Sequence, residues 1–226
     1  MKVLYRISNN SNPKAKICDK FTCLQNFLAV FPHNKTFLFG DNLNLETRLF
    51  VKGQIKDTEV RFKDLGSLGN SRSFMHVFNY ALDHFPDNEF VYLVEDDYLH
   101  LPGAYNALTE ISQLDIDYAT LYDHPDKYSK LYDYGADATR VFTTPSLHWK
   151  QTVSTTMTIF SKVKTLREDF DKWHAGCCTN PPLDHKIFLS LSHRILVSSI
   201  PGLSTHVEAA FLSPVHDWRG VVDEYK

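Results

Sequence analysis

The sequence predicts an α/β protein with a mixed, mostly parallel central sheet flanked by helices. Up to about residue 125, apolar β-prone segments alternate with segments of helical period, which is typical of strand–helix–strand units and a parallel sheet. Residues 90–94 are apolar throughout, as expected for a buried strand. Beyond residue 125 the alternation stops, and aromatic and β-branched residues fill 139–162. This last segment predicts hairpin strands, which make the sheet mixed.

Each element of the alternating part is predicted from its own pattern. Apolar runs bounded by turn residues predict strands at 3–8, 36–42, 59–65, 90–94 and 118–124. Apolar residues at helical spacing predict helices at 14–31, 66–86 and 101–112, with a weaker helix and a loop at 43–56. Pro32 ends the first helix, and Pro102 lies near the first turn of the last.

The remainder of the chain predicts fewer regular units. A helix is expected at 163–175, another starts after Pro181 and Pro182, and a late strand at 195–208 runs into a loop. No Ser/Gly tract, proline-rich run or internal repeat divides the sequence. We therefore expect one domain over residues 1–226.

Composition narrows the function classes. A formal net charge of −3 and a pI near 6.4 argue against a nucleic-acid partner bound by bulk phosphate neutralisation. The four cysteines lack metal-ligand spacing and predict reduced thiols. No apolar run approaches the length of a transmembrane segment. These features predict a cytoplasmic protein.

An acidic triplet ends the central apolar strand in the stretch FVYLVEDDYLH. Glu95, Asp96 and Asp97 should lie at the carboxyl edge of the sheet, where open α/β sheets bind ligands, and Asp41 ends a neighbouring strand. Three adjacent carboxylates repel one another, and burial penalises their charge. A divalent cation such as Mg²⁺ or Mn²⁺ would compensate them. The alternative is that these acids cap the next helix or line a solvated turn.

Several common motifs are missing from the sequence. It contains no phosphate-binding G-x-x-x-x-G-K-[ST], no dinucleotide-binding G-x-G-x-x-G, no G-x-S-x-G and no H-E-x-x-H. The sequence therefore gives no support for P-loop, Rossmann, serine-hydrolase or zincin chemistry.

The order of these features resembles the glycosyltransferases of the GT-A fold. A first strand with a polar turn, a second strand ending in Asp41, and a central strand ending in VEDD are similar to the inverting group called family 2, with VEDD as the xDD variant of the DxD motif. The resemblance spans the whole chain. It implies a metal-dependent transferase that moves a hexosyl-type sugar from a nucleotide-diphosphate donor to a hydroxyl of a glycan or glycoconjugate.

The resemblance also implies site residues. The predicted contacts of the nucleotide-sugar donor are Ser8, Asn9, Lys14, Asp41, Arg72, Glu95 and Asp96. Asp41 matches a residue that usually contacts uracil, which implies a UDP-linked donor. The predicted ligands of Mn²⁺ or Mg²⁺ are Asp97 and His206. Arg72 is also explained as a surface arginine, and His206 as a packing residue.

The catalytic base implied by the resemblance is Asp184, at the start of the helix after the two prolines. Family members carry Glu-Asp where this sequence has Leu-Asp. The alternatives are that Asp184 is a helix N-cap, or that His185 is the base. Trp149, His148 and Trp173 are candidates for stacking on acceptor sugar rings; the alternative is that the tryptophans are core residues, as they more often are.

Two other functions remain open at the level of sequence. A sugar-1-phosphate nucleotidyltransferase would share the fold and metal chemistry, although its glycine-rich first loop is missing. A catalytically inactive nucleotide-sugar-binding module would keep the site without turnover.

Overall fold

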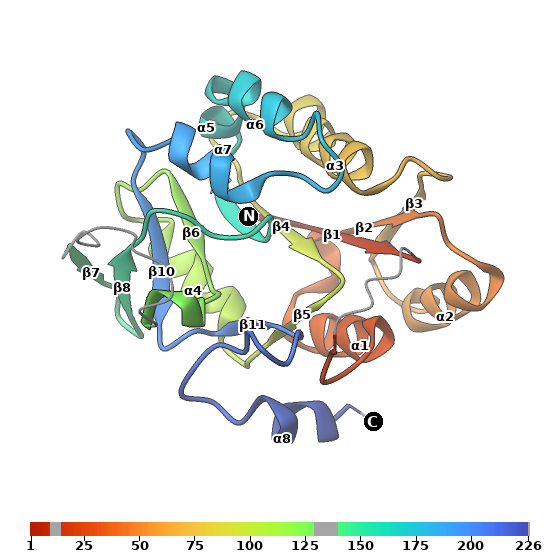
Figure 1. Cartoon of the computed structure of the whole chain (residues 1–226). Helices are drawn as coiled ribbons and strands as arrows, with labels where there is room; N and C mark the ends of the chain where they lie inside the picture. The colour runs from red at the N-terminus through yellow and green to blue at the C-terminus, as the bar shows by residue number, and fades with distance from the viewer. Residues whose placement is uncertain (10–14, 129–139, 226) are drawn as a thin grey trace.

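A computed structural model describes residues 1–9, 15–128 and 140–225 of the chain (Figure 1). The predicted donor contact Lys14 lies outside these residues. The strands are β1 (Lys2–Ser8), β2 (Thr36–Asp41), β3 (Arg61–Asp64), β4 (Phe90–Glu95), β5 (Tyr98–His100), β6 (Tyr118–Thr120), β7 (Val141–Thr143), β8 (His148–Gln151), β9 (Ile159–Lys162), β10 (Leu196–Ile200) and β11 (Ser204–His206). The helices are α1 (Lys20–Val30), α2 (Leu45–Ile55), α3 (Asn70–His84), α4 (Ala104–Ile111), α5 (Val163–Glu168), α6 (Phe170–Gly176), α7 (Asp184–Ser190) and α8 (Trp218–Asp223), with 3₁₀ turns at His33–Lys35 and Pro125–Tyr128.

The main sheet is mixed, as the sequence predicted. Its nine strands follow the order β3-β2-β1-β4-β9-β6-β10-β8-β7 in the described part of the chain. The first four are mutually parallel, and β10 is parallel to β6, whereas β9 and β8 are antiparallel to their neighbours. The alternating half of the sequence therefore supplies one parallel block, and its carboxyl ends share one edge.

Strand β9 differs from the hairpin expected over residues 139–162. Only β7 and β8 form that hairpin, while β9 inserts between β4 and β6 and runs antiparallel to both. Ile159, Phe160 and Ser161 are buried, so the segment gains more by entering the sheet interior than by extending an edge. Because Ile159 pairs with Leu93, residues 154–158 lie beside the carboxyl end of β4.

A second, two-stranded sheet lies at the same edge. The single late strand predicted at 195–208 is divided at Pro201-Gly202 into β10 and β11, and β11 pairs with β5 rather than with the main sheet. In this pairing His206 is opposite Tyr98. The chain reversal after Asp97 thus brings His206 next to the acidic triplet.

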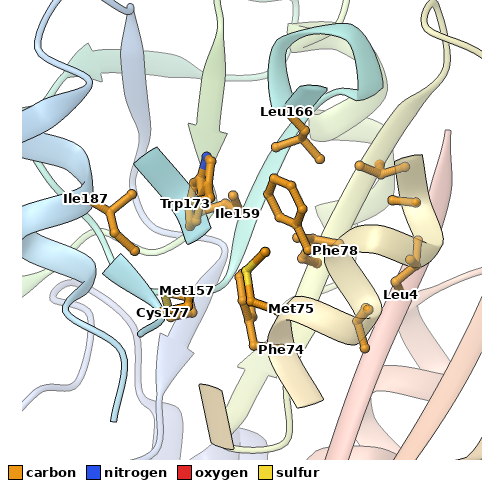
Figure 2. Close-up of a cluster of buried hydrophobic side chains, with 14 of the residues drawn as sticks. Leu4, Phe74, Met75, Phe78, Met157, Ile159, Leu166, Trp173, Cys177 and Ile187 are labelled. Atoms are coloured by element: carbon orange, nitrogen blue, oxygen red, sulfur yellow. The ribbon is translucent and has the colours of Figure 1, made fainter. Parts of the chain in front are cut away.

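Helices cover both faces of the sheet (Figure 1). Helices α3, α5, α6 and α7 pack on one face through the cluster in Figure 2, and α1, α2 and α4 pack on the other. Trp173 lies inside the first cluster and Trp149 inside the second, each with no exposed surface. The expectation that these two indoles stack on acceptor sugars is therefore wrong, because burial leaves no ring face for a ligand. Of the three residues suggested for that role, His148 is the exposed one.

None of the described helices is long and apolar enough to cross a membrane.

Candidate active site

Four of the predicted donor residues, Ser8, Asp41, Glu95 and Asp96, lie where β1, β2 and β4 end. Parallel pairing places Ser8 opposite Asp41 and Arg6 opposite Glu95. The backbone N–H of Ser8 donates to Asp96 Oδ2 over 2.6 Å. The first and central strands are thus joined directly through one of the predicted acids.

Arg6 is a site residue that sequence reasoning missed. Its guanidinium is buried, pairs with Glu95, and donates to Ser73 Oγ at 3.0 Å and to the Asn70 carbonyl at 3.4 Å. Burial raises the pKa of Glu95 to about 7, with Arg6 opposing the rise and the neighbouring aspartates adding to it. The available signal was a charged residue inside the apolar run VLYRIS.

The pKa values of the two aspartates in the triplet are shifted in opposite directions. Burial and the charge of Asp97 raise the pKa of Asp96 to about 6, against the Ser8 N–H. Burial also acts to raise the pKa of Asp97, but His206 and Lys16 outweigh it and hold that pKa at about 2. His206 Nε2 lies 3.0 Å from Asp97 Oδ2, and Lys16 Nζ lies 3.4 Å from the same oxygen. Asp97 is therefore the acid that stays ionised at every physiological pH.

His206 is held at Asp97 by the second sheet. The backbone N–H of Glu208 donates to His206 Nδ1 at 3.3 Å, and the Tyr98 ring contacts the imidazole edge at a centroid distance of 5.3 Å. Burial acts to lower the pKa of His206, but the Asp97 carboxylate raises it overall. These contacts aim Nε2 at Asp97.

The Asp97–His206 pair fits a divalent cation of the implied kind. It offers one carboxylate oxygen at once, and His206 Nε2 becomes a second donor atom for Mn²⁺ when it loses the proton that it now donates to Asp97. Such cations commonly use one or two carboxylates and complete their shell with substrate phosphates and water. In the described residues, no three His, Cys, Asp or Glu side chains are grouped closely enough to hold a metal by themselves.

Asp41 and Arg72 occupy different surroundings from the triplet. Asp41 is fully buried, and its two carboxylate oxygens accept from the backbone N–H groups of Leu68 at 2.7 Å and Gly69 at 3.0 Å. Asp41 thereby fixes the loop that leads into α3. Arg72 is exposed on the first turn of that helix, whereas Arg6 is the guanidinium in contact with the triplet.

Asn9 lies just past β1, where its side-chain Oδ1 accepts from the backbone N–H of Asn44 at 3.2 Å. Ser8 and Asn9 thus line the path from β1 towards the start of α2.

Asp184 lies at a cleft beside the triplet. It is the first residue of α7, and Leu183 holds the N-cap position, so Asp184 is not the N-cap. One cavity of about 220 Å³ is lined by Glu95, Tyr98, Tyr122, His124, Thr156, Asp184, His206, Glu208 and Phe211. An adjoining cavity of about 310 Å³ is lined by His124, Asp126, Lys127, Ser154, Thr155, Thr156, Asp184, His185 and Phe211.

The surroundings of Asp184 tune its carboxyl group. Burial raises its pKa, while the backbone N–H of His185, 2.7 Å from Oδ1, opposes the rise. A carboxylate with a raised pKa binds a proton more readily than an ordinary one. His185, the alternative base, is exposed and lines only the larger cavity.

His124 is a second residue that sequence reasoning missed. It follows β6 in the run YATLYDH, at the same carboxyl edge as the triplet, and lines both cavities. The polar pair that ends this predicted strand was the signal available in the sequence.

Comparison with known proteins places the fold. No family model and no curated protein matches the chain. Among solved structures, the galactosyltransferase LgtC in complex with donor and acceptor sugar analogues matches with a TM-score of 0.51 at 11% identity, over 88% of this chain and 73% of that one. Residues 1–349 of S. aureus TarS match with a TM-score of 0.50 at 11% identity, over 88% of this chain and 58% of that one. The chain therefore has the GT-A fold, the mixed α/β architecture that the sequence resemblance predicted.

Proposed function

We propose that the protein is a metal-dependent glycosyltransferase. It moves a sugar from a nucleotide-diphosphate donor, UDP-linked by resemblance, to a hydroxyl of a glycan or glycoconjugate. The observation that carries the proposal is one cavity whose lining includes His206, Glu95 and Asp184. Donor-activating and proton-accepting groups of the kind that sugar transfer needs thus face the same space.

The donor side of the proposal uses the carboxyl ends of the parallel strands. Asp97 and His206 would hold Mn²⁺ or Mg²⁺, which when bound neutralises charge on the leaving diphosphate. Around the nucleotide, the proposed contacts are Ser8, Asn9, Arg72, Glu95 and Asp96, with Lys14 outside the described residues. The buried Asp41 would act behind them, by holding the Leu68–Gly69 loop. The solved galactosyltransferase, which holds donor and acceptor analogues together on this fold, supports a paired site of this kind.

On the acceptor side, Asp184 takes the proton of the attacking hydroxyl. The acceptor oxygen forms a bond to the anomeric carbon while the bond to the diphosphate breaks, and the leaving group takes the electron pair. A single displacement of this kind inverts the anomeric configuration, as in the inverting group that the sequence resembles. Because protonated Asp184 cannot take the proton of the acceptor hydroxyl, the rate of transfer should fall as pH drops through its raised pKa.

The proposal is tested by separating binding from transfer. UDP with Mn²⁺ should raise the melting temperature of the wild-type protein, since a ligand that binds only the folded state stabilises it. Asp184→Asn should keep this shift and lose about 10²-fold or more in transfer, the usual contribution of a general base. Asp97→Asn should lose the Mn²⁺-dependent part of the shift.

Asp171→Asn, an exposed carboxylate on α6, is the matched control and should change neither quantity. Wild-type transfer by Asp184→Asn would remove the proposed base. Release of diphosphate from a nucleoside triphosphate and a sugar 1-phosphate would show a nucleotidyltransferase instead, and binding with no turnover of any donor would show an inactive module.

A further inference from the structure

Cys18 and Cys23 bring two thiol groups into contact at the start of α1. Their Sγ atoms lie 3.7 Å apart, and either thiol can donate a hydrogen bond to the other. A disulfide bond joins two sulfur atoms at about 2.05 Å. An approach of about 1.7 Å would therefore bring these two sulfurs to bonding distance.

The N-terminus of α1 creates this contact. Asp19 is the N-cap of the helix, and its carboxylate accepts from the Thr22 N–H at 2.9 Å. Cys18 therefore occupies the position before the cap, N′, and Cys23 occupies N4. Side chains at these two positions commonly pack against each other at the start of a helix. The backbone of the helix start thus keeps the two thiols side by side.

The two thiols differ in their access to solvent. Cys18 is partly exposed, whereas Cys23 has no exposed surface. Cys23 packs in a small hydrophobic cluster with Val207 and Trp218. Burial also raises the pKa of the Cys23 thiol, which makes it a poor nucleophile towards reagents in solution. A dissolved oxidant therefore reacts with Cys18 first.

Cys18 ends a stretch of chain that reaches the candidate site. Two residues before it, Lys16 Nζ lies 3.4 Å from Asp97 Oδ2. Between them, the Ile17 N–H donates to the Val207 carbonyl at 2.9 Å. A covalent bond from Cys18 to α1 would fasten this stretch, residues 15–18, to the helix as well.

We propose that Cys18 and Cys23 form a redox modification site, at which a small-molecule disulfide such as oxidised glutathione converts the two thiols into an intramolecular disulfide bond. The bond fastens residues 15–18 to the first turn of α1. This inference does not depend on the proposed sugar transfer.

The conversion proceeds by two thiol–disulfide exchanges. Cys18, as a thiolate, attacks one sulfur of oxidised glutathione, so that a mixed disulfide forms and one glutathione leaves as its thiolate. Cys23 then loses its proton, attacks the Cys18 sulfur and displaces the second glutathione. The two cysteines lose two electrons and two protons, and one glutathione disulfide becomes two reduced glutathiones.

Peptide mapping of the native wild-type protein tests the bond directly. The protein is incubated with oxidised glutathione, its remaining thiols are alkylated, and it is cleaved with trypsin, which cuts after Lys20 between the two cysteines. Peptides 17–20 and 21–35 should appear joined, and dithiothreitol should separate them. Cys178→Ser removes an exposed thiol elsewhere in the chain and should still give the joined peptides.

A second measurement separates placement by the fold from closeness in sequence. The equilibrium between the Cys18–Cys23 disulfide and glutathione is measured in Cys178→Ser, native and unfolded in urea. The native protein should favour the disulfide by about tenfold or more, because the unfolded chain must close the loop from residue 18 to residue 23. Oxidation should then raise the melting temperature of Cys178→Ser, but not that of the double variant that also carries Cys18→Ser.

Hydrogen exchange tests whether residues 15–18 are fastened. Oxidation should slow exchange of the Ile17 amide, because this stretch can no longer separate from α1. In Cys18→Ser, treated in the same way, the Ile17 amide should keep its rate.

The proposal is overturned if glutathione remains on Cys18 as a mixed disulfide, if Cys177 and Cys178 join while Cys18 and Cys23 do not, or if native and unfolded protein favour the bond equally. An unchanged exchange rate of the Ile17 amide in the oxidised protein would overturn the fastening of residues 15–18. None of these measurements uses a sugar donor, an acceptor or a metal, so their outcome is independent of the proposed function.

Discussion

Each acid of the triplet has a partner of its own within the protein. Glu95 pairs with Arg6, Asp96 accepts from the Ser8 N–H, and Asp97 accepts from His206 and Lys16. From the sequence, an external cation was the obvious compensation for three adjacent charges. In the structure, side chains of the protein itself compensate part of this charge. Arg6 and His206 do so from strands β1 and β11, which only the fold brings to the triplet.

At the residue scale, Arg6→Met should destabilise the fold by about 3 kcal/mol, the lower end for breaking a buried ion pair. The cost should grow as pH rises above about 7. Glu95 has a folded pKa above its ordinary value, so its ionised form disfavours folding, and loss of Arg6 raises that pKa further. Urea unfolding at pH 6 and pH 8.5 measures both the cost and its direction.

Arg72→Met is the matched control, since that arginine is exposed on α3, and its effect should stay within about 0.5 kcal/mol. An equal cost for the two variants at both pH values would contradict the importance of the Arg6–Glu95 pair.

At the element scale, strand β5 depends on a buried histidine. His100 has no exposed surface; its Nε2 is 2.9 Å from the Tyr92 hydroxyl of β4, and its backbone groups exchange hydrogen bonds with the Asn26 side chain of α1. Burial lowers the pKa of His100 to about 3. This short strand is thereby joined to both the sheet and a helix, around an imidazole that burial keeps neutral.

Protonation of His100 should therefore weaken the fold in acid. Its folded pKa lies below its unfolded value, so the unfolded chain binds the proton first and stability falls as pH drops below about 6.5. The loss should approach about 1.4 kcal/mol per pH unit until about pH 3. His100→Gln should flatten this slope in urea unfolding at pH 7 and pH 5.

The exposed His148 provides the comparison, because His148→Gln should leave the slope as it is in the wild-type protein. If His100→Gln unfolds with the wild-type pH dependence, another group is responsible for the acid sensitivity.

At the scale of the whole molecule, the parallel strands of the first half were predictable from sequence. The insertion of β9 into the main sheet and the pairing of β11 with β5 were not. Strands β1, β2 and β4 and helix α3 follow their local periodicity closely. Strands β5 and β11 have only three residues each, and β9 pairs with β4 about 70 residues away, so neighbouring sequence contains little sign of either. Such pairings are decided by which edge remains open after the other strands are placed.

The same division holds for the candidate site. Asp96, Asp97 and His206 were predicted as site residues because acids and a histidine follow apolar runs, and the structure places them together at one edge of the sheet. Arg6 was missed because its partner Glu95 is distant in sequence, and His124 because the cavities that it lines form only between distant segments. Asp41 was identified as an edge residue, but its full burial depends on the Leu68–Gly69 loop that encloses it.

The segment before α1 was predicted to be helical, but it pairs with a segment near the other end of the chain. The helix expected from residue 14 begins at Lys20, because the Asp19 side chain caps it by accepting from the Thr22 N–H at 2.9 Å. Residues 15–17 instead run alongside 207–209, with Ile17 N–H bonded to the Val207 carbonyl and Ala209 N–H to the Ala15 carbonyl. This pairing carries Lys16 to Asp97.

Lys16 should therefore compete with any metal that binds Asp97. Lys16→Met should tighten Mn²⁺ binding in the absence of nucleotide by up to about fivefold, the upper value of a partly exposed ion pair. Titration calorimetry with Mn²⁺ alone measures the change. Lys20→Met should have a smaller effect, because Lys20 Nζ donates to the Ser8 carbonyl instead. Unchanged Mn²⁺ affinity in Lys16→Met would rule out the competition.

The ammonium of Lys16 would then act as a tethered counter-ion that balances the Asp97 carboxylate. Without metal, Lys16 shares the Asp97 carboxylate with His206. If Asp97 binds a metal as proposed, the cation would displace an ammonium that stays attached to the chain beside the site. The concentrations of salt and metal ion, rather than the fold alone, would then determine what fraction of the protein carries a metal at Asp97.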